Sequence, residues 1–427
     1  MSRLAAVLTL GCKLNLADSE EIAHGLRTSG YHVVDRLCEA DAYVINTCSV
    51  THVADAKSRK LIRSVRRLSP GARVTVTGCY PQSAGVDAAI ALGADLVVGT
   101  RDADKRELVA FLAGEGPTAP LPETCAPPLH TRAFVKAQEG CNDVCAFCIV
   151  PRTRGREESR SVAQVAAEVN RSVESGAREV VITGTQLGAW GRDLAPPLRP
   201  HHLISGILEQ TEVLRLRFSS LQPQDITPDL LALWQDPRLM PHFHLALQSG
   251  SEATLRAMRR RYTAAQFVDA AARIKAAVPG AAITTDVIAG FPGETDGAFE
   301  ATLALCRDVA FARLHCFPYS QRSRTTAARL PGQLPPPVKQ ERMSRLLALG
   351  EELSLAFRRE HAGTMRPVLW ESERPARDGG ESLWHGHTDN YIPVYGTGTG
   401  LLNRVTPVAL GEVYHDGVRG YSPMEAA

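Results

Sequence analysis

Residues 140–148 read GCNDVCAFC, a run in which Cys141, Cys145 and Cys148 have the spacing C-x3-C-x2-C. The run follows residues 133–138, AFVKAQ, whose pattern predicts a strand. An iron–sulfur cube has four irons, so three thiolates leave one iron open to a ligand that is not protein. We therefore expect an iron–sulfur site. Zinc is the alternative, although zinc sites usually pair such cysteines with a second Cys or His pair, and no matching pair follows closely.

A second set of cysteines ends three short apolar runs in the first hundred residues. Cys12, Cys48 and Cys79 follow predicted strands at 4–10, 42–47 and 73–78, and a further strand is predicted at 95–99. Helix-length stretches separate these runs, which favours a parallel sheet. Ligands of open α/β sheets lie beyond the carboxyl ends of the strands, so we expect the three thiols to converge on one cluster.

The next part of the sequence predicts a partial (β/α) barrel of six units. Val162, Val165, Ala166, Val169 and Val173 recur at steps of three and four, as in a helix between two of its strands. The strand-like runs are 133–138, 179–184, 214–221, 243–248, 282–290 and 312–317. The thiols of GCNDVCAFC then lie after the first barrel strand, at the end where barrel enzymes build their active sites.

Beyond the barrel, residues 337–361 predict one long amphipathic helix that packs through Met343, Leu346, Leu347, Leu353 and Phe357. Short strand-like pieces at 366–372, 391–396, 404–410 and 411–415, broken by Gly, Pro, Asn and Asp, then predict a small antiparallel β-barrel. The fold class is thus α/β, with an N-terminal parallel-sheet domain at 1–114, a Pro-rich linker at 115–130, a barrel domain at 131–362 and the small barrel at 363–427.

Composition places few limits on function. The chain has 427 residues, and 48 Lys+Arg against 46 Asp+Glu give a formal charge of only +2, so any basic surface must be local. The start of the chain lacks the pattern of a secretory signal, and no run approaches the ~18 apolar residues of a membrane span. We therefore expect a cytoplasmic protein without membrane contact, in which clustered cysteines are ligands rather than disulfides.

GCNDVCAFC resembles the C-x3-C-x-aromatic-C signature of radical S-adenosylmethionine enzymes. In that superfamily the cofactor's amino and carboxylate groups chelate the open iron, and an electron from the cluster cleaves its C–S bond to give a radical. Phe147 at the aromatic position covers the cluster or its ligand, or is ordinary loop packing. The addition of Cys12, Cys48 and Cys79 narrows the resemblance to the methylthiotransferases, which implies two [4Fe–4S] clusters, S-adenosyl-L-methionine and a terminal barrel of the TRAM type.

Short motifs resemble one branch of that family most closely. They are GCKLN at 11–15, RRRYT at 259–263, TTDVIAGFPGE at 284–294, FPYS at 317–320 and HTDNY at 387–391. This MtaB-type branch converts N6-threonylcarbamoyladenosine at position 37 of tRNA to its 2-methylthio form. Isopentenyladenosine-directed and ribosomal-protein-directed branches are the alternatives, and a zinc-dependent RNA-binding protein or an electron carrier are alternatives of another class. The resemblance implies the anticodon loop of tRNA and an electron donor such as flavodoxin or ferredoxin as partners, and leaves the oligomeric state open.

The resemblance also implies cofactor contacts at the ends of barrel strands. These residues are Thr183, Gly184, Gln248, Ser249, Gly290 and Glu294; turn glycines and polar caps are the equally good structural interpretation. No catalytic acid or base is singled out beyond the cluster ligands. Basic runs at 57–67, 152–160 and 259–261 could meet tRNA phosphates. For the first run a solvated helix face is favoured, and for the second, beside the cluster, a functional role.

Overall fold

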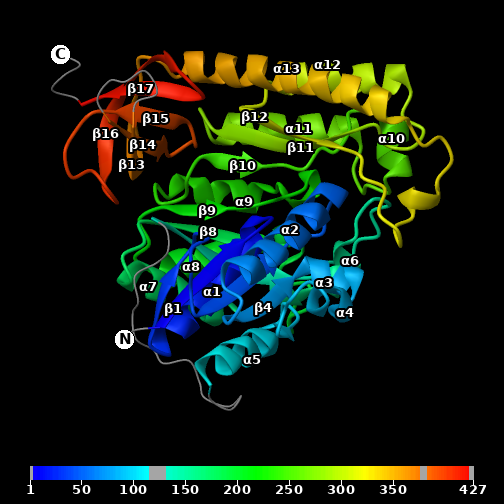
Figure 1. The fold of residues 1–427 in the computed structure, drawn as a ribbon. Helices are drawn as coiled ribbons and strands as arrows, with labels where there is room; N and C mark the ends of the chain where they lie inside the picture. The colour runs from blue at the N-terminus through cyan, green and yellow to red at the C-terminus, as the bar shows by residue number, and fades with distance from the viewer. Residues whose placement is uncertain (1–2, 115–130, 376–381, 423–427) are drawn as a thin grey trace. The chain divides into compact units, whose positions relative to one another are not determined.

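The computed structural model describes residues 3–114, 131–375 and 382–422 (Figure 1). The chain divides into two compact units. The first contains Met1–Ala177, Val181–Leu198 and Ser320–Thr325, and the second contains Arg178–Val180, Arg199–Tyr319 and Thr326–Ala427. The predicted linker at 115–130 lies outside the described residues. The division into three domains stays a prediction.

The first unit begins with a five-stranded parallel sheet in the order β2-β1-β3-β4-β5. Strands β1 (Arg3–Thr9), β3 (Ala42–Thr47) and β4 (Arg73–Gly78) confirm the predicted runs, whereas β5 (Leu96–Val97) is shorter than predicted. The edge strand β2 (Tyr31–Val34) was not predicted, because it has only four residues and a partly exposed pattern.

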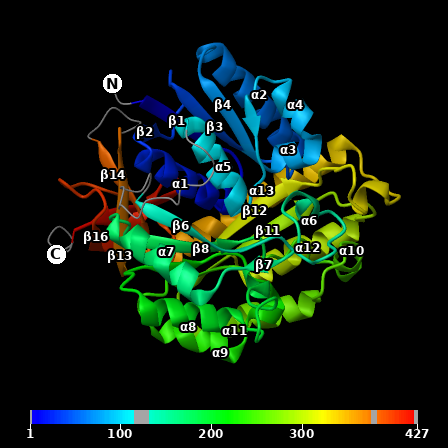
Figure 2. The ribbon, with the colours of Figure 1, turned by 90° about the horizontal axis from the view of Figure 1, so that it is seen from below.

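Helices cover both faces of this sheet, because alternate residues of each strand point to opposite sides. Ala5 and Val7 of β1 pack in one core with residues of α1 (Lys13–Thr28) and α5 (Asp102–Ala113). Ala6 and Leu8 pack in a second core with residues of α2 (His52–Leu68). Figure 2 shows α1 and α5 on one side of these strands and α2 on the other. Both faces are therefore buried, and the strands are continuously apolar.

The rest of the first unit holds the start of the predicted barrel. Strand β6 (Arg132–Glu139) has the short antiparallel strand β7 (Glu158–Ser159) on one side and β8 (Glu179–Gly184) on the other. Helix α7 (Val162–Glu174) confirms the predicted helix and buries Val165, Ala166 and Val169. The strand β7 was not predicted, because two residues carry no periodicity.

The second unit holds strands at the other four predicted runs. These strands are β9 (Leu216–Phe218), β10 (His242–His244), β11 (Ala282–Ala289) and β12 (Arg313–Pro318). β9 and β10 are shorter than the runs predicted at 214–221 and 243–248. β10, β11 and β12 form a parallel sheet, and isolated parallel bridges join the neighbourhood of β9 to that of β10. The helices of this part are α8 (Pro200–Gln210), α9 (Pro228–Ala232), α10 (Glu252–Ala257), α11 (Ala264–Ala277) and α12 (Asp296–Val309).

The long helix α13 (Pro336–Glu360) confirms the helix predicted at 337–361 and stands out in Figure 1. It buries Leu346, Leu349 and Leu353, which recur at steps of three and four. The predicted packing of Leu347 is wrong, because this side chain lies one position off that stripe and is 57% exposed.

The chain ends in a closed barrel in the order β13-β14-β15-β17-β16. Its strands are β13 (Met365–Arg374), β14 (Leu383–Thr388), β15 (Pro393–Gly396), β16 (Val405–Tyr414) and β17 (Gly417–Tyr421). All neighbours are antiparallel except β15 and β17, which are parallel. The pieces predicted at 404–410 and 411–415 are one strand, whose register shifts between Leu410 and Val413. Within the described ranges, no helix has the length and apolar character to cross a membrane.

Candidate functional site

Three strands of the N-terminal sheet lead into three cysteines. Cys12 precedes α1, Cys48 follows β3, and Cys79 begins α3 (Cys79–Ala84) directly after β4. Burial raises the pKa of the Cys48 thiol to about 11, and the thiols of Cys79 and Cys12 contribute to this shift. The structure therefore brings these three thiols, here called the N-terminal triad, within electrostatic reach of one another at the carboxyl edge of the sheet.

A glycine is required where two loops of the N-terminal triad meet. Gly11 has φ +111°, a conformation that side chains other than glycine rarely adopt. A Cβ at this position would lie 2.8 Å from Cβ of Cys48 and 3.1 Å from its sulfur. Any larger residue would therefore push the loop of Cys12 away from Cys48.

The second set of thiols, here called the barrel triad, lies in the loop after β6. The thiol of Cys141 donates to Oε1 of Gln186 at 3.1 Å and accepts from the backbone N–H of Asp143 at 3.4 Å. The N–H of Cys148 donates to the carbonyl of Cys145 at 3.1 Å, which folds the loop back. Gly140, before the loop, has φ +71°, and a Cβ there would lie 1.9 Å from the carbonyl oxygen of Arg156.

Burial and neighbouring groups act on the thiol of Cys141. Burial raises the pKa of Cys141 to about 11, the N–H of Asp143 lowers it, and the nearby Asp143 carboxylate and Cys145 thiol raise it further. A metal binds this sulfur only as a thiolate, so metal binding there would release a proton. Phe147, between the second and third cysteine of this triad, is half-buried.

All six cysteines are free thiols. Among the described residues, no group of three or more His, Cys, Asp or Glu side chains is arranged to hold one metal ion. A single tetrahedral ion needs its ligands around one centre, whereas each thiolate of a [4Fe–4S] cube binds a different iron. The assignment of the two triads as ligands of such cubes therefore stays a prediction.

Arg154 is a buried residue that connects the loop after the barrel triad with the N-terminal triad. Its guanidinium donates to Oδ1 of Asn15 at 2.6 Å, to Oδ2 of Asp18 at 3.1 Å and to Oε1 of Glu139 at 2.8 Å. Burial raises the pKa of the Cys79 thiol, and the charge and hydrogen bond of Arg154 lower it. Arg154 therefore favours the thiolate at Cys79. Its side chain is only 2% exposed, so the suggestion that it meets RNA phosphates is wrong.

Arg322 is a second buried arginine beside the N-terminal triad, and no sequence pattern pointed to it. It belongs to the segment Ser320–Thr325, which is part of the first unit. Its guanidinium binds the carboxylate of Asp55 and donates to Oγ of Ser49 at 2.9 Å and to Oγ of Ser83 at 3.1 Å. Ser49 follows Cys48, and Ser83 lies in the helix that Cys79 begins, so one side chain holds both cysteine loops.

The predicted cofactor contacts Thr183 and Gly184 end β8 in the first unit. Thr183 is buried, and a Cβ on Gly184 would lie 2.9 Å from the side chain of Leu187. The next residue, Thr185, was not predicted, yet its hydroxyl is buried and has no hydrogen-bond partner in the described part of the chain. Buried polar atoms are normally satisfied, so this hydroxyl is a candidate contact for a bound ligand.

The other predicted contacts lie in the second unit and have partners within the protein. Gln248 has φ +66° and lies between backbone hydrogen bonds to β11. The hydroxyl of Ser249 lies 3.2 Å from that of Thr302. The carboxylate of Glu294 accepts from the N–H of Gly290 at 2.8 Å and from Arg342 at 2.7 Å. These contacts support the structural interpretation of Ser249, Gly290 and Glu294, and cofactor binding by them stays a prediction.

Two family models match the chain. Residues 5–99 match the uncharacterized protein family UPF0004, and residues 135–306 match the radical SAM superfamily. The first range contains the N-terminal triad and the second the barrel triad. The two kinds of thiol site therefore coincide with two separately defined sequence families.

Curated relatives cover nearly the whole chain. It is 36% identical to the threonylcarbamoyladenosine tRNA methylthiotransferase MtaB of Bacillus subtilis, over 96% of this chain and 94% of that protein. It is 37% identical to a tRNA-2-methylthio-N(6)-dimethylallyladenosine synthase of Mycobacterium bovis, over 86% of this chain and 76% of that protein. Among solved structures, the radical S-adenosylmethionine methyltransferase TsrM of Kitasatospora setae shares the fold, with a TM-score of 0.52 and 16% identity over 74% of this chain and 75% of that one.

Proposed function

The chain belongs to the radical S-adenosylmethionine methylthiotransferases, and from that membership we propose that it converts N6-threonylcarbamoyladenosine at position 37 of tRNA to the 2-methylthio derivative. The observation that carries this proposal is the presence of two thiol triads in one compact unit. The relative named for the same reaction, which covers 96% of the chain, supports the choice of substrate.

S-adenosyl-L-methionine and a [4Fe–4S] cluster are the cofactors of this superfamily. We assign that cluster to Cys141, Cys145 and Cys148, and a second cluster to Cys12, Cys48 and Cys79. When bound, these groups supply the radical that breaks a C–H bond and the sulfur that enters the product. Phe147, Thr183, Gly184, Gln248, Ser249, Gly290 and Glu294 stay the proposed cofactor contacts, and Thr185 joins them because its buried hydroxyl lacks a partner among the described residues.

The chemistry explains why a radical is proposed. The C2–H of a purine is barely acidic and has no leaving group, so neither a general base nor a thiolate can replace it with sulfur.

The protein's own groups have simpler roles. The six thiols bind metal, Gln186 and the N–H of Asp143 orient Cys141, and Arg154 stabilises the thiolate of Cys79.

The proposed macromolecular partner is the anticodon loop of tRNA, where an unstacked base can be presented without opening a duplex. A flavodoxin- or ferredoxin-type protein is the proposed electron donor, and the cytoplasm is the proposed compartment. The terminal barrel β13–β17 is proposed as a TRAM-type RNA-binding domain.

A dimethylallyladenosine substrate is the second candidate, because the Mycobacterium bovis relative of that name is 37% identical. Mass spectrometry of tRNA nucleosides from cells without this gene separates the two. Loss of the methylthio group from threonylcarbamoyladenosine supports the proposal. Loss from the isopentenyl nucleoside, or from a ribosomal protein, assigns the chain to another branch of the family.

The division of labour between the triads has its own test. We expect Cys145→Ala to abolish reductive cleavage of S-adenosylmethionine, because the barrel triad then keeps only two thiols. Cys48→Ala should leave that cleavage detectable and stop formation of methylthio-tRNA. Both are measured on anaerobically reconstituted protein by chromatography of 5′-deoxyadenosine and of tRNA nucleosides. A Cys48→Ala enzyme that still makes the product contradicts the assignment.

A further inference from the structure

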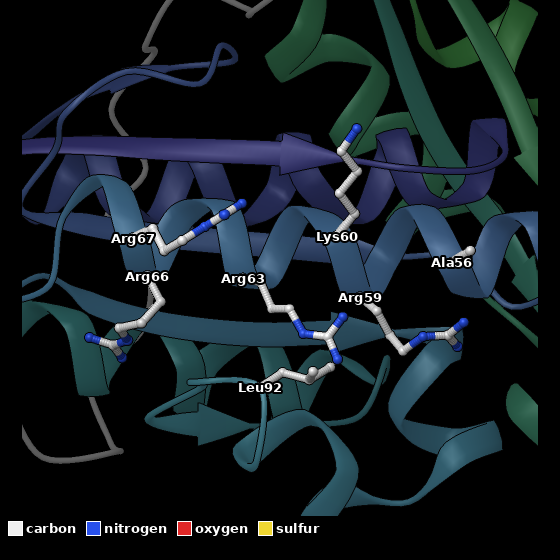
Figure 3. Close-up of a pocket in the computed structure, with 7 residues that line it drawn as sticks. All are labelled: Ala56, Arg59, Lys60, Arg63, Arg66, Arg67 and Leu92. Carbon is white, nitrogen blue, oxygen red and sulfur yellow. The ribbon is translucent and has the colours of Figure 1, made fainter.

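One face of α2 forms an open groove of about 560 Å³ with a strongly basic lining. The lining residues are Ala56, Arg59, Lys60, Arg63, Arg66, Arg67 and Leu92 (Figure 3). Sites for small organic ligands have volumes of about 300–1,000 Å³ but are lined mainly by apolar and aromatic side chains. Here five of the seven lining residues are cations, so the groove suits a polyanion better than a small apolar molecule.

Three of the five cations follow one stripe of the helix, and Arg59 and Arg66 lie beside it. Ala56, Lys60, Arg63 and Arg67 recur at steps of four, three and four, whereas Ile62 and Val65 on the opposite side are buried against the sheet. From Ala56 to Arg67 the stripe is about 16 Å long, at 1.5 Å per residue. In Figure 3 the side chains of Arg59, Arg63 and Arg66 extend to the side of the helix on which Leu92 lies.

The charges of this groove are largely available for a partner. Among the described residues, the side chains of Arg59, Lys60 and Arg63 make no hydrogen bond or ion pair. Arg66 differs, because it binds Asp95 at 2.8 Å and the carbonyl of Gly93, and so fixes the loop that forms the other wall. The one carboxylate of α2, Asp55, is bound by Arg322. With a formal charge of only +2 on the whole chain, this helix carries an unusual concentration of positive charge.

We propose that the α2 groove binds the phosphate backbone of the substrate tRNA, an inference that rests on the proposed function. Helix α2 begins four residues after Cys48, so its basic stripe extends away from the N-terminal triad. A tRNA backbone that follows the stripe to the N-terminus of α2 therefore reaches the segment that carries Cys48. An acidic electron-transfer protein fits less well, because the centre of a protein–protein interface is apolar and aromatic, and Ala56 and Leu92 are the only apolar residues of the groove.

The test is the salt dependence of tRNA binding by the full chain. The probe is tRNA that carries threonylcarbamoyladenosine at position 37, and the variant is Arg59→Gln/Arg63→Gln. Each phosphate contact contributes about 0.7–0.9 to the slope of log K against log salt. We expect the slope to fall by about 1.4–1.8 and the affinity at 0.1 M salt to fall by roughly 25-fold or more. Arg59→Lys/Arg63→Lys should stay within about threefold of wild type, because Lys keeps the charge.

The matched control is Lys57→Gln/Arg106→Gln, which removes two exposed cations of the same unit outside the groove. Its slope should equal that of the wild type, and cleavage of S-adenosylmethionine without tRNA should be unchanged in every variant. If the groove variant keeps the wild-type slope and affinity, or if the control loses as much, the inference is overturned. A groove variant that binds tRNA normally but needs more flavodoxin for cleavage also overturns it, in favour of a protein partner. A wild-type protein that does not bind this tRNA refutes the proposed function instead.

Discussion

Replacement of the buried Arg154 by Gln should destabilise the first unit strongly. Removal of one member of a buried ion pair costs about 3–5 kcal/mol. Asp18 and Glu139 would keep Lys136 as an ion-pair partner, because its Nζ lies 2.9 Å and 2.8 Å from their carboxylates. We therefore expect a loss of stability at the lower end of this range, about 3 kcal/mol. This loss corresponds to a fall of roughly 6–12 °C in the unfolding temperature of a unit of this size.

The assay is calorimetry of the cluster-free full chain under reducing conditions, with Arg156→Gln as the control. Arg156 is exposed and only two residues away, so its replacement should change stability by less than about 0.5 kcal/mol. Iron per chain after anaerobic reconstitution is the second measurement. Because Arg154 lowers the pKa of Cys79, its loss should reduce the iron content from roughly eight towards four. An Arg154→Gln protein with the unfolding temperature of the wild type would refute this reasoning, since the contacts would then be worth no more than a surface pair.

Two further predictions concern Arg322 and the terminal barrel. Arg322→Gln should speed the removal of iron from the N-terminal triad by a chelator several-fold, because both cysteine loops lose their shared hydrogen-bond donor. The control is the exposed neighbour Arg324, whose change to Gln should have no effect on this rate. Equal chelation rates in the Arg322→Gln protein and the wild type would contradict the role of Arg322. Burial, and then the imidazole of His387, lowers the pKa of His385 from 6.5 to about 4. Unfolding then takes up a proton between these values, so stability should fall as the pH is lowered from 6.5 to 4. His385→Phe should flatten this dependence in calorimetry between pH 7 and 4.5, and an unchanged slope would show that His385 is not its source.

Much of the fold was predictable because its strands are short apolar runs with clear ends. Runs 4–10, 42–47 and 73–78 match β1, β3 and β4 closely, since strands buried on both faces are apolar throughout. Prediction failed where burial depends on partners distant in sequence. β2 is a four-residue edge strand, and β16 continues through Gly411, a residue that the sequence pattern treats as a break.

The residues around the thiols likewise divide into those that the sequence pattern indicates and those that only the structure reveals. The six cysteines were singled out by their spacing and by their position after predicted strands, and their role as cluster ligands stays a prediction. Arg154 was noticed as one of several basic residues, but its burial could not be predicted, because its partners Asn15 and Asp18 lie more than 130 residues away. Arg322 carries no local signal, since an arginine in QRSRT looks like any exposed loop residue.

The late position of Arg322 in the sequence has a consequence for biosynthesis. Its partner Asp55 lies 267 residues earlier. At about 5–20 residues per second, the ribosome needs roughly 13–53 s to make the stretch between them. Throughout that interval the newly made N-terminal sheet lacks the guanidinium that binds the hydroxyls of Ser49 and Ser83. The hydrogen bonds that join these two loops to Arg322 therefore form only after nearly all of the first unit has been synthesised.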